Sequence, residues 1–428
     1  MITDVLADEG KGKRTRLLFI VEAALEYFVQ ILVTGAFLAT LLSRNGVPDW
    51  LVGILSSFIS LTCVFQIFSA SVVRRGSSVK KTAFFLVLAN EVLFVLLYVI
   101  PIFKIPSAVK CVLFVILIFS AYVLYNLVSP LKFSWYMLFV KSDQRGSFTA
   151  KKEIVSLVGG IAFSFAMGSV SDYYTARGED NTAFLISALA IFVISLVHLL
   201  TVALTSEHSL EVSGVGNGFF SSLKVLANKT VLPLIALEIL WKCASQISNP
   251  FYGIYQTSEL GFTLTFVSFL AMTQSVVRAS VSMLMGKIAD RFGWRVNLII
   301  CFGAVTVGYI TMVLCTPENG RLMYLLHNIF NGIAMAGING GLMNIYFDYV
   351  PAAERTATLG VKAAIGGVCG FIATSLASVA LARMQSVEMS IAGMPVYAQQ
   401  VLSLVSTVLC LIATLYVVFV IKRLKKID

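Results

Sequence analysis

The chain has 428 residues, of which 58% are hydrophobic and 13% are charged, and its formal net charge at pH 7 is +10. Soluble globular proteins carry about 25% charged residues, so this composition excludes an ordinary soluble domain and indicates a membrane protein. Apolar stretches long enough to cross a bilayer take up most of the length. Because no room is left for a soluble catalytic domain, we predict that the chain is not an enzyme and uses no cofactor.

Hydropathy predicts an all-α membrane protein with twelve transmembrane helices, since about 20 apolar residues span the hydrocarbon core. The first apolar stretch is too long for a signal-peptide core, and no small-residue cleavage site follows it. We therefore expect it to remain as the first helix. The predicted helices cover residues 17–43, 50–72, 82–103, 107–130, 147–171, 183–204, 230–256, 262–285, 295–315, 321–347, 356–382 and 396–421.

The basic residues indicate the orientation of the chain. If the N-terminus is inside the cell, 24 of the 32 Lys and Arg residues, Lys132 among them, fall in cytoplasmic segments. This asymmetry is typical of the positive-inside rule. We therefore predict an integral protein of the plasma (inner) membrane with both termini in the cytoplasm. The net positive charge is accounted for by orientation, so we expect no nucleic-acid partner.

The two halves of the sequence resemble each other. A shift of 216 residues places Glu22, Glu26 and Gln30 on Glu238, Lys242 and Gln246. An even number of helices gives both copies the same orientation, as in parallel transporter repeats. We predict an N-terminal six-helix bundle (1–204), a cytoplasmic linker (205–227) and a C-terminal six-helix bundle (228–428).

A short charged segment lies between the eighth and ninth predicted helices. It follows the pattern G-x-x-x-D-R-x-G-x-R and consists of Gly286, Asp290, Arg291, Gly293 and Arg295. This segment resembles the loop signature of the major facilitator superfamily. A degraded copy without the acidic residue occupies residues 73–81. The resemblance implies two six-helix bundles that alternate access to a central site, with this segment as a cytoplasmic gate.

The resemblance also implies a role for Asp290. In this family the corresponding carboxylate docks on the start of a helix in the other half. Free N–H groups and the helix dipole favour a negative charge at such a position. By symmetry we expect its target at the start of the fifth helix, near Ser147–Lys152. Alternatively, these charges only set topology and cap the ninth helix.

Ionisable side chains inside a membrane span are costly and are candidates for function. Glu22, Glu26 and Gln30 follow each other at four-residue spacing, so they share one face of the first helix. Glu26 lies near the midplane, where a carboxylate is suited to taking up and releasing a proton. We predict Glu26, Glu22 and Glu91 as proton-coupling residues. Alternatively, Glu22 is an interfacial residue and Glu91 has a structural partner. His327 and, more weakly, His198 are further proton-relay candidates, although satisfied core histidines are the simpler interpretation.

Other polar side chains in the predicted spans are candidates for substrate contact. Arg278 suits a carboxylate or phosphate group, and amides suit a hydroxyl-rich or zwitterionic ligand. Lys242 lies four residues after Glu238, so the two alternatively form an ion pair within one helix. The full predicted substrate-binding set is Arg278, Lys242, Glu238, Gln30, Gln246, Gln274, Asn126 and Asn331. We predict no metal site.

These features favour a secondary active transporter for a small polar organic solute, working by alternating access and coupled to protons as a symporter. No phosphate-binding loop for ATP occurs. The alternative is a proton-driven efflux pump for amphiphilic compounds, and a minor alternative is a non-transporting membrane sensor. The expected partners are the solute, protons and the lipid bilayer, and we expect a monomer.

Gly366 with Gly370, and Ser156 with Gly160, predict close helix packing.

Overall fold

The computed structural model describes residues 9–68, 72, 78–137, 139–140, 145–206, 230–350, 352–385, 390–391 and 394–424. The chain forms two compact units. Among the described residues, unit 1 contains those of Met1–Val47, Phe65–Gly216 and Thr263–Ser268, and unit 2 contains those of Pro48–Val64, Asn217–Phe262 and Phe269–Asp428.

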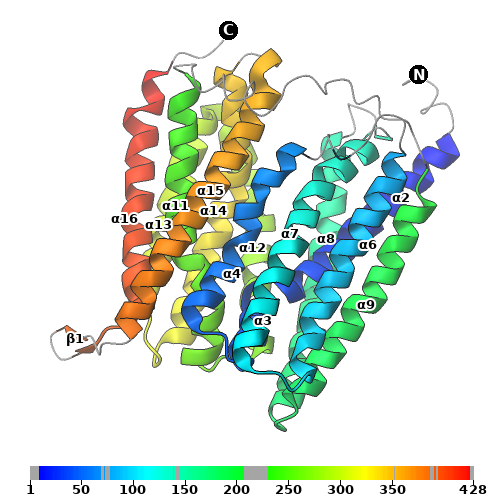
Figure 1. The fold of residues 1–428 in the computed structure, drawn as a ribbon. Coiled ribbons are helices and arrows are strands. Elements are labelled where there is room, and N and C mark those ends of the chain that lie inside the picture. Colours follow the sequence, from blue (N-terminus) through cyan, green and yellow to red (C-terminus); the bar gives the residue numbers. More distant parts are fainter. Residues whose placement is uncertain are drawn as a thin grey trace. The chain divides into compact units, whose positions relative to one another are not determined.

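Long helices make up both units (Figure 1). Unit 1 contains α2 (Glu9–Val33), α3 (Gly35–Arg44), α6 (Val79–Val99), α7 (Ser107–Met137), α8 (Arg145–Thr175) and α9 (Asp180–Leu204). Unit 2 contains α4 (Asp49–Thr62), α11 (Val231–Ile254), α13 (Trp294–Val313), α14 (Gly320–Tyr349), α15 (Ala352–Gln385) and α16 (Ala398–Phe419). The helix α12 (Leu264–Phe292) begins in unit 1 and continues in unit 2.

Short elements connect or extend these helices. They are η1 (Cys63–Phe68), η2 (Ile100–Ile102), the π-helical turn η5 (Tyr255–Glu259), η6 (Ile421–Arg423), and the antiparallel strands β1 (Ser390–Ile391) and β2 (Met394–Pro395).

The helices account for the predicted membrane spans. Eleven described helical segments are long and apolar enough to cross a bilayer. The helix α14 is not among them, although it has 30 residues, because Asn328, Asn331, Asn339 and Asn344 lower its hydropathy. With α14 the spans correspond to the twelve predicted helices. The predicted all-α membrane fold is confirmed.

In unit 1, α6 packs against both α7 and α9, and α2 packs against α8 and α9 (Figure 1). Aromatic rings fill one end of this packing, where Phe19 stacks on Tyr136 with 4.3 Å between ring centroids. Small residues let α8 approach α2 closely. A Cβ atom on Gly160 would lie 2.3 Å from the ring of Tyr27, which agrees with the close packing expected at this position.

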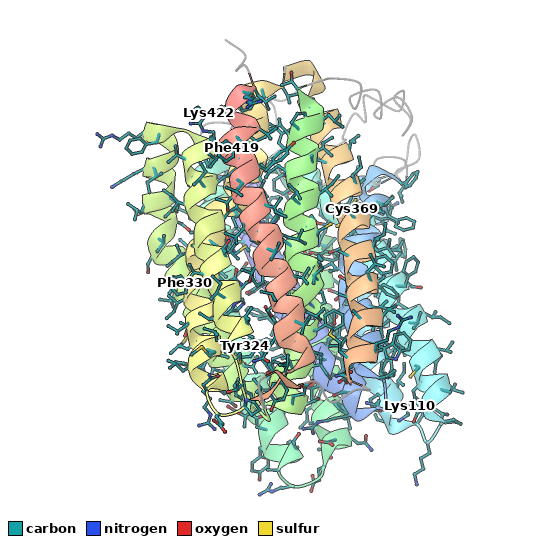
Figure 2. All side chains as sticks on the ribbon, turned by 90° about the vertical axis from the view of Figure 1, so that its left-hand side faces the viewer. Lys110, Tyr324, Phe330, Cys369, Phe419 and Lys422 are labelled. Carbon is teal, nitrogen blue, oxygen red and sulfur yellow. The ribbon has the colours of Figure 1, made fainter. Side chains whose placement is uncertain are left out.

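In unit 2, α11 packs against α15 and α16, and α15 also packs against α4. Gly366 and Gly370 of α15 face α11, where added Cβ atoms would lie 3.1 and 3.0 Å from Glu238 and Gln246. Gly367 faces α4 instead. Large apolar side chains cover the outer surface, as on α16, where Phe419 is 60% exposed near Lys422 (Figure 2). Such a surface fits the hydrocarbon of a bilayer.

Three boundaries differ from the sequence prediction. The first predicted helix is divided into α2 and α3 at Thr34, because Gly35 has a φ of 55° and the Thr34 hydroxyl donates to the carbonyl of Gln30. The helix α7 continues past Pro130 to Met137. The helix α4 ends at Thr62, and η1 follows it.

The predicted division into bundles remains a prediction. The helix α4 groups with unit 2, and the first turn of α12 groups with unit 1. Most of the predicted linker lies outside the described residues.

We predict that Gly367→Ala destabilises the protein. A Cβ atom at this position would lie 2.4 Å from the backbone oxygen of Ser60, so α4 and α15 would have to separate. Overpacking of this kind lowers the free energy of unfolding by about 1–3 kcal/mol. Thermal unfolding in detergent measures the effect. Gly303→Ala on α13 is the control, because nothing lies within 4 Å of its added Cβ. Equal melting temperatures of the two variants would contradict the packing described for Gly367.

Candidate functional site

Five ionisable side chains from four helices converge inside unit 1. Glu22 and Glu26 come from α2, Glu91 from α6, Lys132 from α7 and His198 from α9. The three predicted proton-coupling carboxylates therefore lie in one group, which we call the charge cluster. Packing of α6 between α7 and α9, and of α2 on α9, brings the four helices together.

Lys132 binds both carboxylates of α2. Its Nζ lies 2.5 Å from Oε1 of Glu22 and 2.7 Å from Oε2 of Glu26. Lys132 is 4% exposed and Glu22 is 1% exposed. An ammonium group buried this deeply is stable only with carboxylate partners. Lys132 was expected among the cytoplasmic charges, and Glu22 had an alternative interpretation as an interfacial residue. Both are instead buried partners in one network.

His198 bridges two carboxylates. Its Nδ1 contacts Oε1 of Glu91, and its Nε2 lies 3.0 Å from Oε1 of Glu22. A neutral imidazole has only one N–H group, so hydrogen bonds to two carboxyl groups require one further proton. That proton is carried either by the ring or by one of the carboxyl groups. The His198 bridge therefore includes an exchangeable proton.

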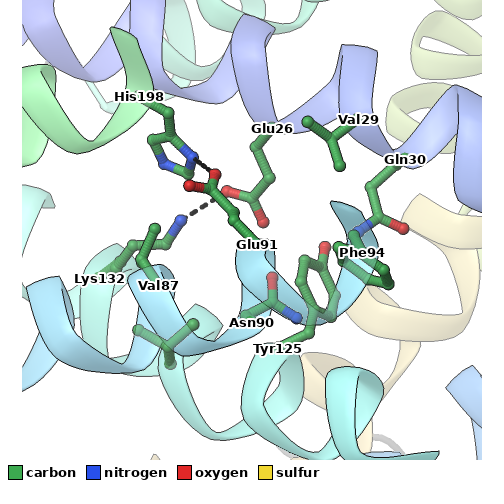
Figure 3. A pocket seen from close by; sticks show the side chains of 11 residues that line it. Glu26, Val29, Gln30, Val87, Asn90, Glu91, Phe94, Tyr125, Lys132 and His198 are labelled. Atoms are coloured by element: carbon green, nitrogen blue, oxygen red, sulfur yellow. Dashed lines mark hydrogen bonds and ion pairs between the residues drawn. The ribbon is translucent and has the colours of Figure 1, made fainter. Parts of the chain in front are cut away.

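A small cavity lies beside the charge cluster (Figure 3). Its volume is about 10 Å³, which is close to the space that one water molecule needs. Glu26, Glu91, Lys132 and His198 line it, together with Gln30, Asn90 and Tyr125. Tyr125 and Glu26 both line this cavity. Within the described part of the chain, the buried Oε2 atom of Glu91 has no hydrogen-bond partner.

The charge cluster has the ligand types of a metal site, but its centre is occupied by an ammonium group. Ligand atoms of Glu22, Glu26 and His198 all lie within 4.8 Å of one another. Because the Lys132 ammonium contacts both carboxylates, a metal ion here would have to displace it. The arrangement is that of a buried ion-pair network, suited to holding and moving protons.

The corresponding polar side chains of unit 2 have different partners. Glu238 lies 3.2 Å from Lys362 of α15, so the ion pair predicted within one helix is replaced by a pair between two helices. Lys362 also donates to the carbonyl of Leu342, 2.9 Å away. Gln246 donates to the Ser60 hydroxyl at 2.9 Å. Lys242 is half-buried and has no ion pair among the described residues.

The remaining predicted contact residues are scattered over both units. Asn126 is buried and accepts a hydrogen bond from Gln66 at 2.6 Å. Asn331 has a buried Oδ1 atom without a partner among the described residues. Gln274 and Arg278 are half-buried on α12. All of these remain predictions as substrate ligands.

His327 fits the interpretation of a satisfied core histidine. Its Nδ1 lies 2.9 Å from the carbonyl of Gly308. The rings of Tyr252 and Tyr309 pack against it at 5.2 and 5.9 Å between centroids. These contacts account for its burial without a proton-relay role.

The predicted gate segment consists of the end of α12, the turn at Gly293 and the start of α13. Gly293 has a φ of 84°, a conformation that favours glycine, and it directly precedes the first residue of α13. Arg291 lies over the ring of Phe292. The side chains of Asp290, Ser147 and part of the predicted target lie outside the described residues. The cytoplasmic docking of Asp290 therefore remains a prediction.

Two members of the charge cluster were missed as functional residues. Lys132 lies beyond the end of the predicted helix 107–130 and was therefore counted among the cytoplasmic charges. The apolar and aromatic residues that follow it, up to Met137, were the available signal for a longer helix. His198 was considered only as a weak proton-relay candidate. Its partners lie 107 and 176 residues away, and no periodicity in the sequence indicates such pairing.

Comparisons with known proteins agree with this architecture. The family model of the Major Facilitator Superfamily matches residues 18–374 and 234–426. Among solved structures, the chain resembles the nucleoside transporter NupG, with 12% identity, coverage of 96% of this chain and 98% of that chain, and a TM-score of 0.69. A search of curated protein sequences gave no match.

Two further solved structures are similar. For a D-xylose-proton symporter the identity is 11%, the coverage is 94% of this chain and 96% of that chain, and the TM-score is 0.70. For a bacterial homologue of the iron transporter ferroportin in the inward-facing state, the identity is 14%, the coverage is 95% of this chain and 98% of that chain, and the TM-score is 0.65. At these identities the likeness concerns the fold. The fold is that of multi-pass membrane transporters, and the chain belongs to the major facilitator superfamily.

We predict that Lys132→Met strongly destabilises unit 1. The substitution keeps the apolar stem but leaves the carboxylates of Glu22 and Glu26 without their ammonium partner. Breaking a buried ion pair in this way lowers the free energy of unfolding by about 3–5 kcal/mol. Thermal or denaturant unfolding in detergent measures the loss.

Two further variants test the cause of this effect. The double variant Lys132→Met with Glu22→Gln should recover part of the stability, because one uncompensated charge is removed. Lys104→Met removes an exposed lysine and should leave the unfolding transition unchanged. If Lys132→Met unfolds like the wild type, the ion pairs described here do not stabilise the unit.

Proposed function

We propose that the protein is a secondary active transporter that moves a small polar organic solute by alternating access, coupled to protons as a symporter. It acts as a monomer in the plasma membrane with both termini in the cytoplasm. The charge cluster carries this proposal, since buried ionisable groups inside a transporter bundle are typical of proton relays.

Charge balance supports the proton as the coupling ion. Among the described residues, the cationic partners of the three carboxylates Glu22, Glu26 and Glu91 are the Lys132 ammonium and the His198 imidazole. Even with a doubly protonated ring, the cluster carries one excess negative charge. In an environment of low dielectric constant this charge is neutralised most simply by a proton on a carboxyl group. Glu26 is the candidate, because it lines the cavity and is the most exposed of the three.

The nature of the solute is proposed from the polar side chains that remain available. Gln30 lines the cavity beside Glu26, and the Lys242 ammonium has no carboxylate partner among the described residues. An ammonium and several amides suit a ligand with hydroxyl, carbonyl or carboxylate groups. The similar solved structures of a nucleoside transporter and a D-xylose-proton symporter place nucleosides and pentoses first in the panel to be tested.

The solute is identified by ligand-induced stabilisation. A compound that binds only the folded protein raises its melting temperature. The panel contains uridine, D-xylose, amino acids and organic acids. A compound that shifts the transition is then used in radiolabelled form for transport in proteoliposomes.

We predict that an inward proton gradient drives accumulation of this compound and that Glu26→Gln abolishes the accumulation. A permanently neutral amide cannot release a proton, so solute movement is no longer tied to the gradient. Exchange of labelled for unlabelled solute should persist, because it needs no net proton movement. The comparison is between uptake and exchange in the same proteoliposomes. Accumulation that ignores the pH gradient in the wild type would remove proton coupling from the proposal.

A further inference from the structure

A carboxylate at the end of α8 caps the first turn of α12. Oδ1 of Asp172 accepts a hydrogen bond from the backbone N–H of Leu264 at 2.9 Å, and Oδ2 accepts one from Thr265 at 2.8 Å. The first N–H groups of a helix have no partner within the helix, and the helix dipole attracts negative charge there. Asp172 thus caps the N–H groups of Leu264 and Thr265 from another helix, while the Thr263 hydroxyl, directly before α12, accepts from the N–H of Phe266.

The same two helices meet along a narrow polar strip. Ser164, Gly168 and Asp172 are spaced four residues apart, so they lie on one face of α8. The Ser164 hydroxyl donates to the Ser268 hydroxyl at 2.7 Å. At Gly168 the backbones touch, since an added Cβ would lie 3.0 Å from the backbone of Leu264 and Thr265. The printed contacts of the strip are made by hydroxyl, carboxylate and backbone groups.

This composition makes the contact reversible at low cost. Separation of an apolar interface exposes hydrophobic surface to water, whereas the groups of this strip exchange their hydrogen bonds for bonds to water. The strip also includes the start of α12, a long helix that is divided between the units. Residues Thr263–Ser268 belong to unit 1, and α12 continues in unit 2 from Phe269.

We propose that Asp172 is a latch that binds the start of α12 to α8 and opens during each transport cycle. This inference rests on the proposed function, since a transporter working by alternating access must release and remake the contacts that close one side.

Cross-linking tests the latch without a transported solute. In the double variant Ser164→Cys and Ser268→Cys, the new thiols replace two hydroxyls that touch, so a mild oxidant joins them rapidly while the latch is closed. Adding Asp172→Asn replaces one of the two acceptor oxygens by an NH2 group that cannot accept a hydrogen bond. We expect cross-linking to slow by about fivefold to tenfold, the ratio that corresponds to loss of a helix cap.

Matched variants separate the latch from general effects. Asp172→Glu retains the carboxylate and should restore much of the cross-linking rate. Asp180→Asn removes a neighbouring carboxylate that contacts Arg44 and should leave the rate unchanged. A second measurement uses Ser268→Cys with Ser164 retained. Its thiol should react faster with a membrane-impermeant maleimide when Asp172→Asn is added than when Asp172 is present. Equal cross-linking and labelling with Asp172 and with Asp172→Asn would overturn the proposal.

Amide hydrogen exchange of the wild-type protein provides a second test, which does not require Asp172→Asn to fold. A latch that opens in the native state lets the amides of Leu264 and Thr265 exchange much faster than those of the buried helices, by local opening. A permanent structural cap lets them exchange only at the rate of the surrounding helices, and that result would contradict the latch. Neither readout depends on protons as the coupling ion, so failure of proton coupling in transport leaves the result unaffected.

Discussion

The interior of unit 1 depends on the ion pairs that the Lys132 ammonium makes with two carboxylates. It contacts Glu22 at 2.5 Å and Glu26 at 2.7 Å, and His198 connects the same network to Glu91. Without this cation three carboxylates from two helices would share one buried region, which is unfavourable unless they are protonated. The network therefore stabilises the packing of four helices and at the same time provides groups whose charge changes with proton binding.

The internal repeat places carboxylates at equivalent positions in the two halves, but their ion-pair partners differ. Glu22 and Glu238 are equivalent under the internal shift, yet Glu22 pairs with Lys132 and His198, whereas Glu238 pairs with Lys362 of α15. Each half therefore neutralises its buried carboxylate from a different helix. Only unit 1 joins an imidazole to two carboxyl groups among the described residues. This asymmetry favours proton coupling through unit 1 and leaves Lys242 of unit 2 available for a solute.

Much of the fold could be predicted from the sequence, because spans depend on hydropathy and hydropathy is local. The Gly366 and Gly370 spacing likewise predicted the close approach of α15, which the contacts with Glu238 and Gln246 show. Three carboxylates of the site were found because a charge inside an apolar stretch is conspicuous. Their partners were not found, since Lys132 lies beyond the predicted end of the fourth helix and His198 meets Glu22 only through tertiary packing. The break before Gly35 was missed because a single glycine does not reveal its φ angle.

The central claim is that protons move through the charge cluster together with the solute. Simultaneous measurement of proton and solute fluxes in proteoliposomes loaded with a pH-sensitive dye tests it most directly, with the wild type compared with His198→Gln. Proton influx should accompany solute influx at a fixed ratio in the wild type. In the variant it should disappear while solute exchange continues, since the glutamine amide cannot carry a proton between Glu91 and Glu22. An unchanged ratio of the two fluxes in His198→Gln would contradict the account.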